Sequence, residues 1–163
     1  EMCIRDRAWA IYGYTACFRE TNDSIFLNFA KDIANMIMDR VKTEDAIPYW
    51  DYDAPVTKET PRDVSAASVT ASAMIELSTM VPDGQKYLDY AEKILKSLSS
   101  DAYLAKVGDN QGFILMHSVG SLPNGSEIDT PLNYADYYYL EALKRFMELK
   151  KLKVENGELR VIQ

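Results

Sequence analysis

Apolar side chains recur at steps of three and four residues along most of this chain, which is the spacing of amphipathic helices. Phe26, Ile33 and Ile37 form one such stripe, while Asn28 and Lys31 fall on the polar side. The same period appears in four other stretches. The pattern therefore predicts an all-α protein with helices over residues 8–20, 24–41, 63–80, 85–98 and 133–150.

The stretch at 63–80 differs from the others because small side chains occupy almost every face of the expected helix. Alanines, serines and a threonine fill most positions from Ser65 to Ala73, and only a few larger residues interrupt them. A helix of this kind lets neighbouring backbones approach closely, so we expect it in a buried, inner position. Pro61 sets its entry, and Asp63 or Ser65 can cap its free amides.

Two long connections separate the helices. Residues 42–62 contain three prolines and the aromatic, acidic run Tyr49-Trp50-Asp51-Tyr52-Asp53, and residues 99–130 contain an apolar run that ends at His117. Loops of this length in compact domains are commonly functional or disordered, and the aromatics favour function here. Both loops follow an outer amphipathic helix and precede an inner one. We therefore expect them to meet at one end of a helical toroid.

The two ends of the chain lack this pattern. Residues 1–7 (EMCIRDR) carry charge without a period, which suggests a junction or a non-native lead, and the partial barrel is expected over residues 8–150. Residues 151–163 read as a polar tail with a brief strand at 158–162.

Composition narrows the class of function. The formal net charge of −7 argues against nucleic-acid binding, which needs a basic stripe. One histidine and no ligand-spaced cluster give no metal site, and no cofactor is implied. No apolar run approaches the roughly 20 residues that span a bilayer. Without a signal-peptide pattern we expect a cytoplasmic location, with the periplasm as the alternative.

Five segments in order along the chain resemble glycoside hydrolase family 88, the unsaturated glucuronyl hydrolases. The resemblance implies an (α/α)6 barrel of six helix pairs, of which this chain would be the C-terminal half. The segments are 8–14 (AWAIYGY), 48–55 (PYWDYDAP), 61–67 (PRDVSAA), 113–120 (FILMHSVG) and 132–143 (LNYADYYYLEAL).

The resemblance also implies a reaction, the release of the unsaturated uronic acid that a polysaccharide lyase leaves at a non-reducing end. An aspartic acid protonates the vinyl ether of the ring and assists water addition. The family's catalytic aspartates lie in the N-terminal half, so this chain holds no catalytic residue and is expected to be inactive alone. Its expected partners are an unsaturated uronyl oligosaccharide and the missing half of the barrel, with no membrane.

Six residues are candidates for substrate binding. The family motif Arg-Gly-Gln-Ala-Trp falls on residues 5–9, so Arg5 and Trp9 match while the two residues after Arg5 depart from it. Trp50 is a candidate pocket wall. His117, Ser118 and Ser121 lie where members that accept sulfated disaccharides carry Ser-x-x-Ser-x-Lys, with proline at 123 in place of the lysine.

Simpler structural roles compete with these assignments. Trp9 could be ordinary helix packing, His117 could be structural, Asp51 and Asp53 more readily satisfy loop amides, and the tyrosines at 137–139 are mostly core by period. Two other functions also compete. One is the related unsaturated rhamnogalacturonyl hydrolase, against which the stretches at 117–120 and 133–138 argue. The other is a helical interaction module whose aromatic loops bind a partner protein.

Overall fold

The computed structural model describes residues 4–155. It contains five α-helices, one short 3-10 helix and one two-stranded antiparallel sheet. The elements are α1 (Ile4–Thr21), α2 (Ser24–Arg40), α3 (Val64–Ser78), α4 (Gln85–Leu98), η1 (Asn110–Gly112), β1 (Ser118–Ser121), β2 (Ser126–Thr130) and α5 (Asn133–Glu155).

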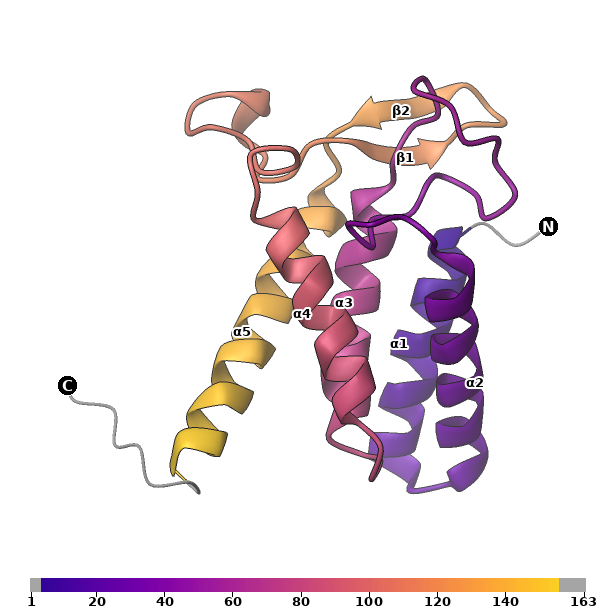
Figure 1. Ribbon diagram of the computed structural model, residues 1–163, viewed down its shortest axis with the longest axis vertical. Helices are drawn as coiled ribbons and strands as arrows, with labels where there is room; N and C mark the ends of the chain where they lie inside the picture. The colour runs from indigo at the N-terminus through magenta and orange to yellow at the C-terminus, as the bar shows by residue number, and fades with distance from the viewer. Residues whose placement is uncertain (1–3, 156–163) are drawn as a thin grey trace.

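The helices form two layers. α1, α3 and α5 lie side by side as the inner layer, while α2 packs on α1 and α4 packs on α3 from outside (Figure 1). α3 contacts α1, α4 and α5, and every residue from Val64 to Ile75 is buried. The small side chains of α3 allow this close approach on several sides at once. The predicted inner, buried position of this helix is confirmed.

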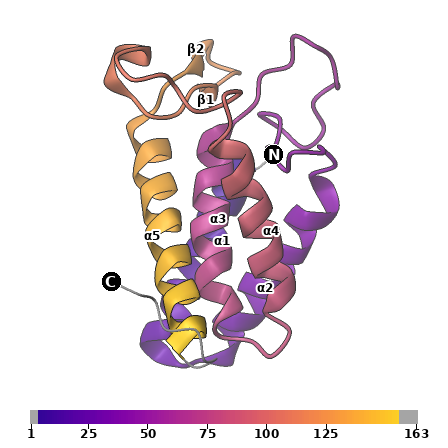
Figure 2. The same cartoon turned by 60° about the vertical axis from the view of Figure 1, so that its left-hand side comes forward.

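Both long loops gather at one end of the helices, as Figures 1 and 2 show, and the short turns after α1 and α3 lie at the other end. A bridge between Tyr49 and Arg62 closes the first loop, and one between Leu104 and Leu115 closes part of the second. The predicted clustering of the loops is confirmed. A rigid helical layer thus carries a set of irregular segments at its end, which is a common arrangement for binding sites.

The β-hairpin was not expected from the sequence. β1 pairs with β2 from Ser118–Thr130 to Ser121–Ser126, with an irregularity after the first pair. β2 is largely exposed and carries polar residues on both faces, so it lacks the alternation that normally reveals a strand. The hairpin covers the end of the inner layer next to α3.

The helix boundaries differ from the expected ones at both ends. α1 begins at Ile4 rather than Ala8, because buried Ile4 continues the stripe of Ala8, Ile11 and Thr15 on the face toward the core. α5 continues to Glu155, past residue 150. The described part of the chain holds five helices, whereas half of a six-pair barrel would hold six. The strand expected at 158–162 lies outside the described residues.

One edge of the inner layer is apolar and open. α5 has α3 on one side only (Figure 1), and its Tyr137, Leu140 and Met147 are 59%, 51% and 58% exposed. They follow steps of three and seven residues and so share one helical face. The exposed Lys144 lies on the same face, and apolar side chains exposed together in this way promote association.

We therefore expect the isolated chain to self-associate in solution. The double variant Leu140→Glu/Met147→Lys should shift light scattering from oligomer toward monomer at equal concentration, because it places charges on the open face. Lys93→Glu, a charge change at an exposed position of α4, is the matched control. A wild-type chain that stays monomeric with a sharp thermal transition would contradict this reading of the edge.

Candidate functional site

A cavity of about 570 Å³ lies at the loop end, between the start of α1, the loop around Trp50 and the β-hairpin. We call it the Arg5 cavity. Arg5 and Asp6 come from α1, Trp50 and the loop to Pro55 form a second wall, and Ser121 with the turn after β1 forms the third. The structure thus brings together three of the six predicted binding residues, Arg5, Trp50 and Ser121.

Arg5 is held by the hairpin and by α5. Its Nη1 donates to the carbonyl of Val119 at 2.7 Å and to the hydroxyl of Tyr134 at 2.9 Å, and its Nη2 donates to the carbonyl of Gly120 at 2.7 Å. The guanidinium also lies 5.4 Å from the centre of the Tyr134 ring. These bonds leave two of its five N–H donors without a partner among the described residues. A fixed fork with spare donors is suited to a carboxylate.

Trp9 lies one helical turn after Arg5 and is half-buried. Its ring meets the Tyr138 ring edge-on, with centroids 4.9 Å apart and planes at 85°, and it meets Tyr12 at 6.3 Å. Trp9 is therefore part of an aromatic cluster between α1 and α5. It is neither fully enclosed core nor a free surface side chain, and it is not among the residues that line the Arg5 cavity.

The contacts between α1 and α5 form a series across the small side chains of α3. After Arg5–Tyr134 and Trp9–Tyr138, the Tyr12 hydroxyl donates to Glu141 at 3.1 Å. The positions on α1 and α5 both advance by three or four residues, so each series lies on one helical face. Along the surface shared by α1 and α5, the side chains are therefore cationic at the loop end, aromatic in the middle and charged in pairs at the far end.

The far end of this face is a partly buried ion-pair network. Arg145 binds Glu76 at 2.9 Å and donates to the carbonyl of Ser72 at 3.0 Å, while the Ser72 hydroxyl donates to Glu141 at 2.5 Å. Arg19 joins it through Glu76 at 2.5 Å. Burial and the neighbouring Glu141 carboxylate raise the pKa of Tyr12 to about 12, so its hydroxyl stays protonated and donates. The network ties α1, α3 and α5 together.

His117 lies in a different cavity. Together with Tyr103 and Asp129 it lines a space of about 520 Å³, and its Nδ1 is 2.6 Å from the Asp129 carboxylate. Its φ of +70° is in the left-handed region, and its carbonyl accepts a bond from the amide of Val64 at 3.2 Å. His117 therefore links the hairpin to the first turn of α3. Its predicted role in binding stays a prediction.

Ser118 is completely buried, and its hydroxyl has no hydrogen-bond partner within the described chain. The neighbouring serine of the motif, Ser121, is half-buried and lines the Arg5 cavity. Ser118 is the buried first residue of β1 and lies before the irregularity in its pairing, whereas Ser121 is the last residue of the strand. Of the serine motif, only Ser121 is placed where it can reach a ligand in the Arg5 cavity.

Asp63 anchors the floor beneath the hairpin. It is 1% exposed and caps α3, and its Oδ1 accepts from the Ser65 amide at 3.0 Å and hydroxyl at 2.6 Å. The Ala66 amide at 3.4 Å and the Val119 amide at 3.5 Å complete the set. Burial raises the pKa of Asp63, an effect that the Ser65 bond and Arg5 partly offset. The predicted capping role is confirmed, and the carboxylate also joins α3 to β1.

Two substitutions at Asp63 should separate its role as a hydrogen-bond acceptor from its role as an ionisable group. Asp63→Ala removes an acceptor shared by several donors and is expected to lower the free energy of unfolding by about 2 kcal/mol. Asp63→Asn keeps the acceptor and should cost about 1 kcal/mol or less at neutral pH. Denaturant unfolding of both variants and wild type measures this.

The difference in free energy of unfolding between wild type and Asp63→Asn should decrease as pH rises. Because the folded-state pKa of Asp63 lies above its unfolded value, the folded protein binds this proton more tightly than the unfolded chain does. Stability from this group is therefore largest at low pH and decreases as pH rises through the raised folded-state pKa. The stability of wild type relative to Asp63→Asn should therefore fall between the unfolded-state pKa and the folded-state pKa of Asp63. A relative stability that rises with pH would contradict a raised pKa for this carboxyl.

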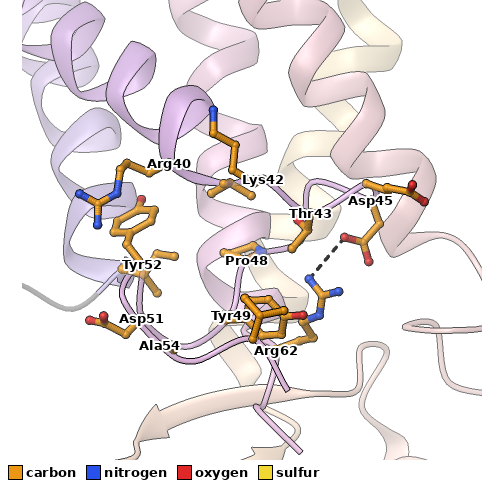
Figure 3. Close-up of a pocket in the computed structure, with 14 residues that line it drawn as sticks. Arg40, Lys42, Thr43, Asp45, Pro48, Tyr49, Asp51, Tyr52, Ala54 and Arg62 are labelled. Atoms are coloured by element: carbon orange, nitrogen blue, oxygen red, sulfur yellow. Dashed lines mark ion pairs between the residues drawn. The ribbon is translucent and has the colours of Figure 1, made fainter. Parts of the chain in front are cut away.

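A third cavity, of about 560 Å³, lies on the other side of the Trp50 loop, and we call it the Tyr49 cavity (Figure 3). Arg62 lies 4.2 Å from the centre of the Tyr49 ring, and Arg40 lies 5.4 Å from that of Tyr52. The Arg62 guanidinium is also 3.5 Å from Asp45. Each aromatic ring is thus paired with an arginine, so these rings are stabilised as walls of the loop.

The carboxylates of this loop have structural partners. Asp51 accepts from the amide of Asp53 at 2.8 Å, and Asp53 pairs with Arg40 at 2.6 Å. The interpretation that Asp51 satisfies a loop amide is confirmed, whereas Asp53 forms an ion pair. Asp51 lines the Arg5 cavity and the Tyr49 cavity, so this loop separates the two.

Within residues 4–155, no three histidine, cysteine, aspartate or glutamate side chains are grouped to hold a metal ion. No helix in that range is long and apolar enough to cross a membrane.

Four residues of the inner wall were missed as site candidates. Tyr134, Tyr138, Glu141 and Arg145 all come from α5, where the run of three tyrosines reads as core. Only Tyr139 is buried as expected, while Tyr137 is exposed and Tyr138 is half-buried. The sequence did offer a signal for them. Positions 134, 138, 141 and 145 advance by three or four residues, as do positions 5, 9 and 12 on α1, so each set lies on one helical face.

Helices in an inner and an outer layer, with an arginine and aromatic site at the loop end, are the arrangement of part of a helical barrel. The model of glycosyl hydrolase family 47 matches residues 6–151. By this match the chain belongs to glycosyl hydrolase family 47. The sequence motifs indicated family 88, so the two assignments agree on a glycosyl hydrolase and differ in the family.

Relatives and solved structures carry the name to which the motifs pointed. The unsaturated glucuronyl hydrolase of Formosa agariphila is 45% identical over 146 residues, which are 89% of this chain and 36% of the relative. That of Bacillus sp. (strain GL1) is 32% identical over 145 residues, 86% of this chain and 38% of the relative. The crystal structure of an unsaturated glucuronyl hydrolase specific for heparin matches with a TM-score of 0.88 and 55% identity.

That structure covers 97% of this chain, and the chain covers 42% of it. The chain thus spans little more than a third of the length of these curated relatives. The expected fold, part of a helical barrel, is confirmed by these structural neighbours.

Proposed function

We propose that this chain is the C-terminal part of an unsaturated glucuronyl hydrolase of the family 88 type, and that it supplies one wall of the substrate site. Identities of 45% and 55% to proteins of that name support the proposal. The intact enzyme removes the unsaturated uronic acid from lyase-generated oligosaccharides by hydration of the vinyl ether. The proton donor belongs to the remainder of the barrel.

The observation that carries the proposal is the arrangement of Arg5. Three bonds to the hairpin and Tyr134 fix the guanidinium, and two donors remain for a ligand. A carboxylate accepts two parallel N–H bonds from such a fork. Trp9, one turn further along the same helix, offers an aromatic surface for the apolar face of the sugar ring. Arg5 would thus orient the uronate carboxylate, and Trp9 the ring.

The lining of the Arg5 cavity also favours a substrate without sulfate. Arg5 is the only cation among the described residues that line it. Asp6, Asp51 and Asp53 contribute carboxylates, of which Asp53 is paired with Arg40. An added sulfate would approach a negative wall, which is unfavourable. Pro123 stands in this wall at the position of the motif's lysine.

Pro123→Lys in the intact protein should therefore raise kcat/KM on a sulfated unsaturated disaccharide relative to its unsulfated counterpart by about two- to fivefold, the value of one exposed charge pair. Pro123→Gln removes the ring without adding charge and is the control. Equal effects of lysine and glutamine would contradict the electrostatic explanation.

The substrate class is tested with the intact polypeptide and two sets of lyase products. One set comes from glycosaminoglycans and the other from rhamnogalacturonan. We expect loss of the conjugated double-bond absorbance, with release of the uronic acid seen by mass spectrometry, on the first set. Turnover of the second set alone would favour the unsaturated rhamnogalacturonyl hydrolase. A folded protein inert on both would leave the interaction module as the better explanation.

A further inference from the structure

Tyr138 is the central contact between the two outer members of the inner helical layer. The centroid of its ring lies 4.9 Å from that of Trp9 and 5.2 Å from that of Tyr12, and the ring planes meet at 85° and 79°. These are edge-to-face arrangements, which are favoured over face-to-face sandwiches. The small side chains of α3 between the two helices leave room for the rings to meet. Tyr138 is thus the α5 residue in direct ring contact with Trp9.

The cluster is rigid on the side away from the loops. Tyr12 is fixed by its bond to Glu141 at 3.1 Å and by the Arg145 guanidinium, 5.3 Å from its ring centre. Glu141 and Arg145 are about four-fifths buried and belong to the ion-pair network with Glu76. Tyr12 and Tyr138 come from different helices and both contact Trp9. Between them they limit the orientations open to the indole.

We propose that Tyr138 is a positioning residue, which acts through Trp9 by holding the indole in the orientation that receives the sugar ring. The inference rests on the proposed function, because it assigns a purpose to the orientation of Trp9. It extends that function by placing the determinant on α5, far along the chain from the motif that contains Trp9. Tyr138 itself contacts no reacting atom.

The orientation of Trp9 can be measured without any activity. The chain contains two tryptophans, so Trp50→Phe leaves Trp9 as the sole indole. In that background Tyr138→Leu, which keeps an apolar side chain but removes the ring, should change the near-ultraviolet circular dichroism and the fluorescence maximum of Trp9. Tyr138→Phe, which keeps the ring, should not. Tyr14→Leu, which removes a half-buried ring of α1 that stacks on Phe26 and Phe29 of α2, is the matched control.

Kinetics of the intact protein then test the link to substrate. Losing one aromatic pair is expected to raise KM by about two- to tenfold in Tyr138→Leu, with kcat changed less, and Tyr138→Phe should restore wild-type values. An unchanged Trp9 spectrum in folded Tyr138→Leu would overturn the proposal. If Tyr138→Leu fails to fold, a changed Trp9 spectrum in Tyr138→Phe would overturn it instead.

The two proposals can fail separately. A shifted Trp9 spectrum with unchanged KM would support the positioning of the indole by Tyr138. The same result would contradict the proposal that Trp9 contacts the sugar ring of the substrate. A KM effect in Tyr138→Leu without a spectral change would show that Tyr138 acts by another route, and it would overturn the positioning role.

Discussion

The 163-residue chain alone is expected to show no turnover of unsaturated uronyl disaccharides. It spans 36% and 38% of the length of its curated relatives, and the proposed proton donor lies in the remainder. Arginine and aromatic side chains can bind and orient a ring, but vinyl-ether protonation needs a positioned acid. Loss of the conjugated absorbance, followed at high chain concentration, measures this.

A control for this experiment is far-ultraviolet circular dichroism of the same sample, which must show a mostly helical spectrum. Activity above buffer from the folded chain would mean that its own carboxylates suffice. In that case Asp6 and Asp51, which line the Arg5 cavity, would be the first residues to examine.

In the intact protein, Trp9→Ala should reduce kcat/KM about ten- to a hundredfold. The substitution removes the proposed stacking surface and also the edge-on contacts with Tyr12 and Tyr138. Loss of this size corresponds to roughly 1–3 kcal/mol of transition-state binding. Initial rates over a range of substrate concentrations give the value.

Trp9→Phe is the matched variant, since it retains an aromatic face and should lose much less. Thermal unfolding of both variants separates packing from binding. A Trp9→Ala protein with a lowered Tm and unchanged kcat/KM would show that the tryptophan is only part of the core. The simpler structural role of Trp9 would then be the right one.

The helical layer could be predicted from the sequence because each element carries its own signal. The stripe on α2, the small residues of α3 and the Asp63 cap are local features, and helix periodicity identifies them directly. Alternation of long and short connections also placed the loops at one end. The start of α1 was missed because residues 1–7 were judged by their charge, although Ile4 continues the apolar stripe of that helix.

The site was predictable only in part, because its geometry depends on pairings between distant segments. Arg5 was found from its motif, yet its contacts with Val119 and Tyr134 span more than a hundred residues. His117 and Ser118 are close to Ser121 in sequence, but the strand geometry and the turn at His117 direct them elsewhere. Tyr138 was expected in the core, since periodicity does not distinguish a fully buried residue from one packed against another half-buried ring.

The central claim is that this chain completes the substrate site of a larger unsaturated glucuronyl hydrolase. Its most direct test is complementation, in which the purified chain is mixed with a separately produced polypeptide that carries the rest of the same barrel. We predict loss of the conjugated double-bond absorbance only when both parts are present, and a much weaker signal when the chain carries Arg5→Ala. Activity of the other part alone, unchanged by adding a folded chain, would contradict the claim.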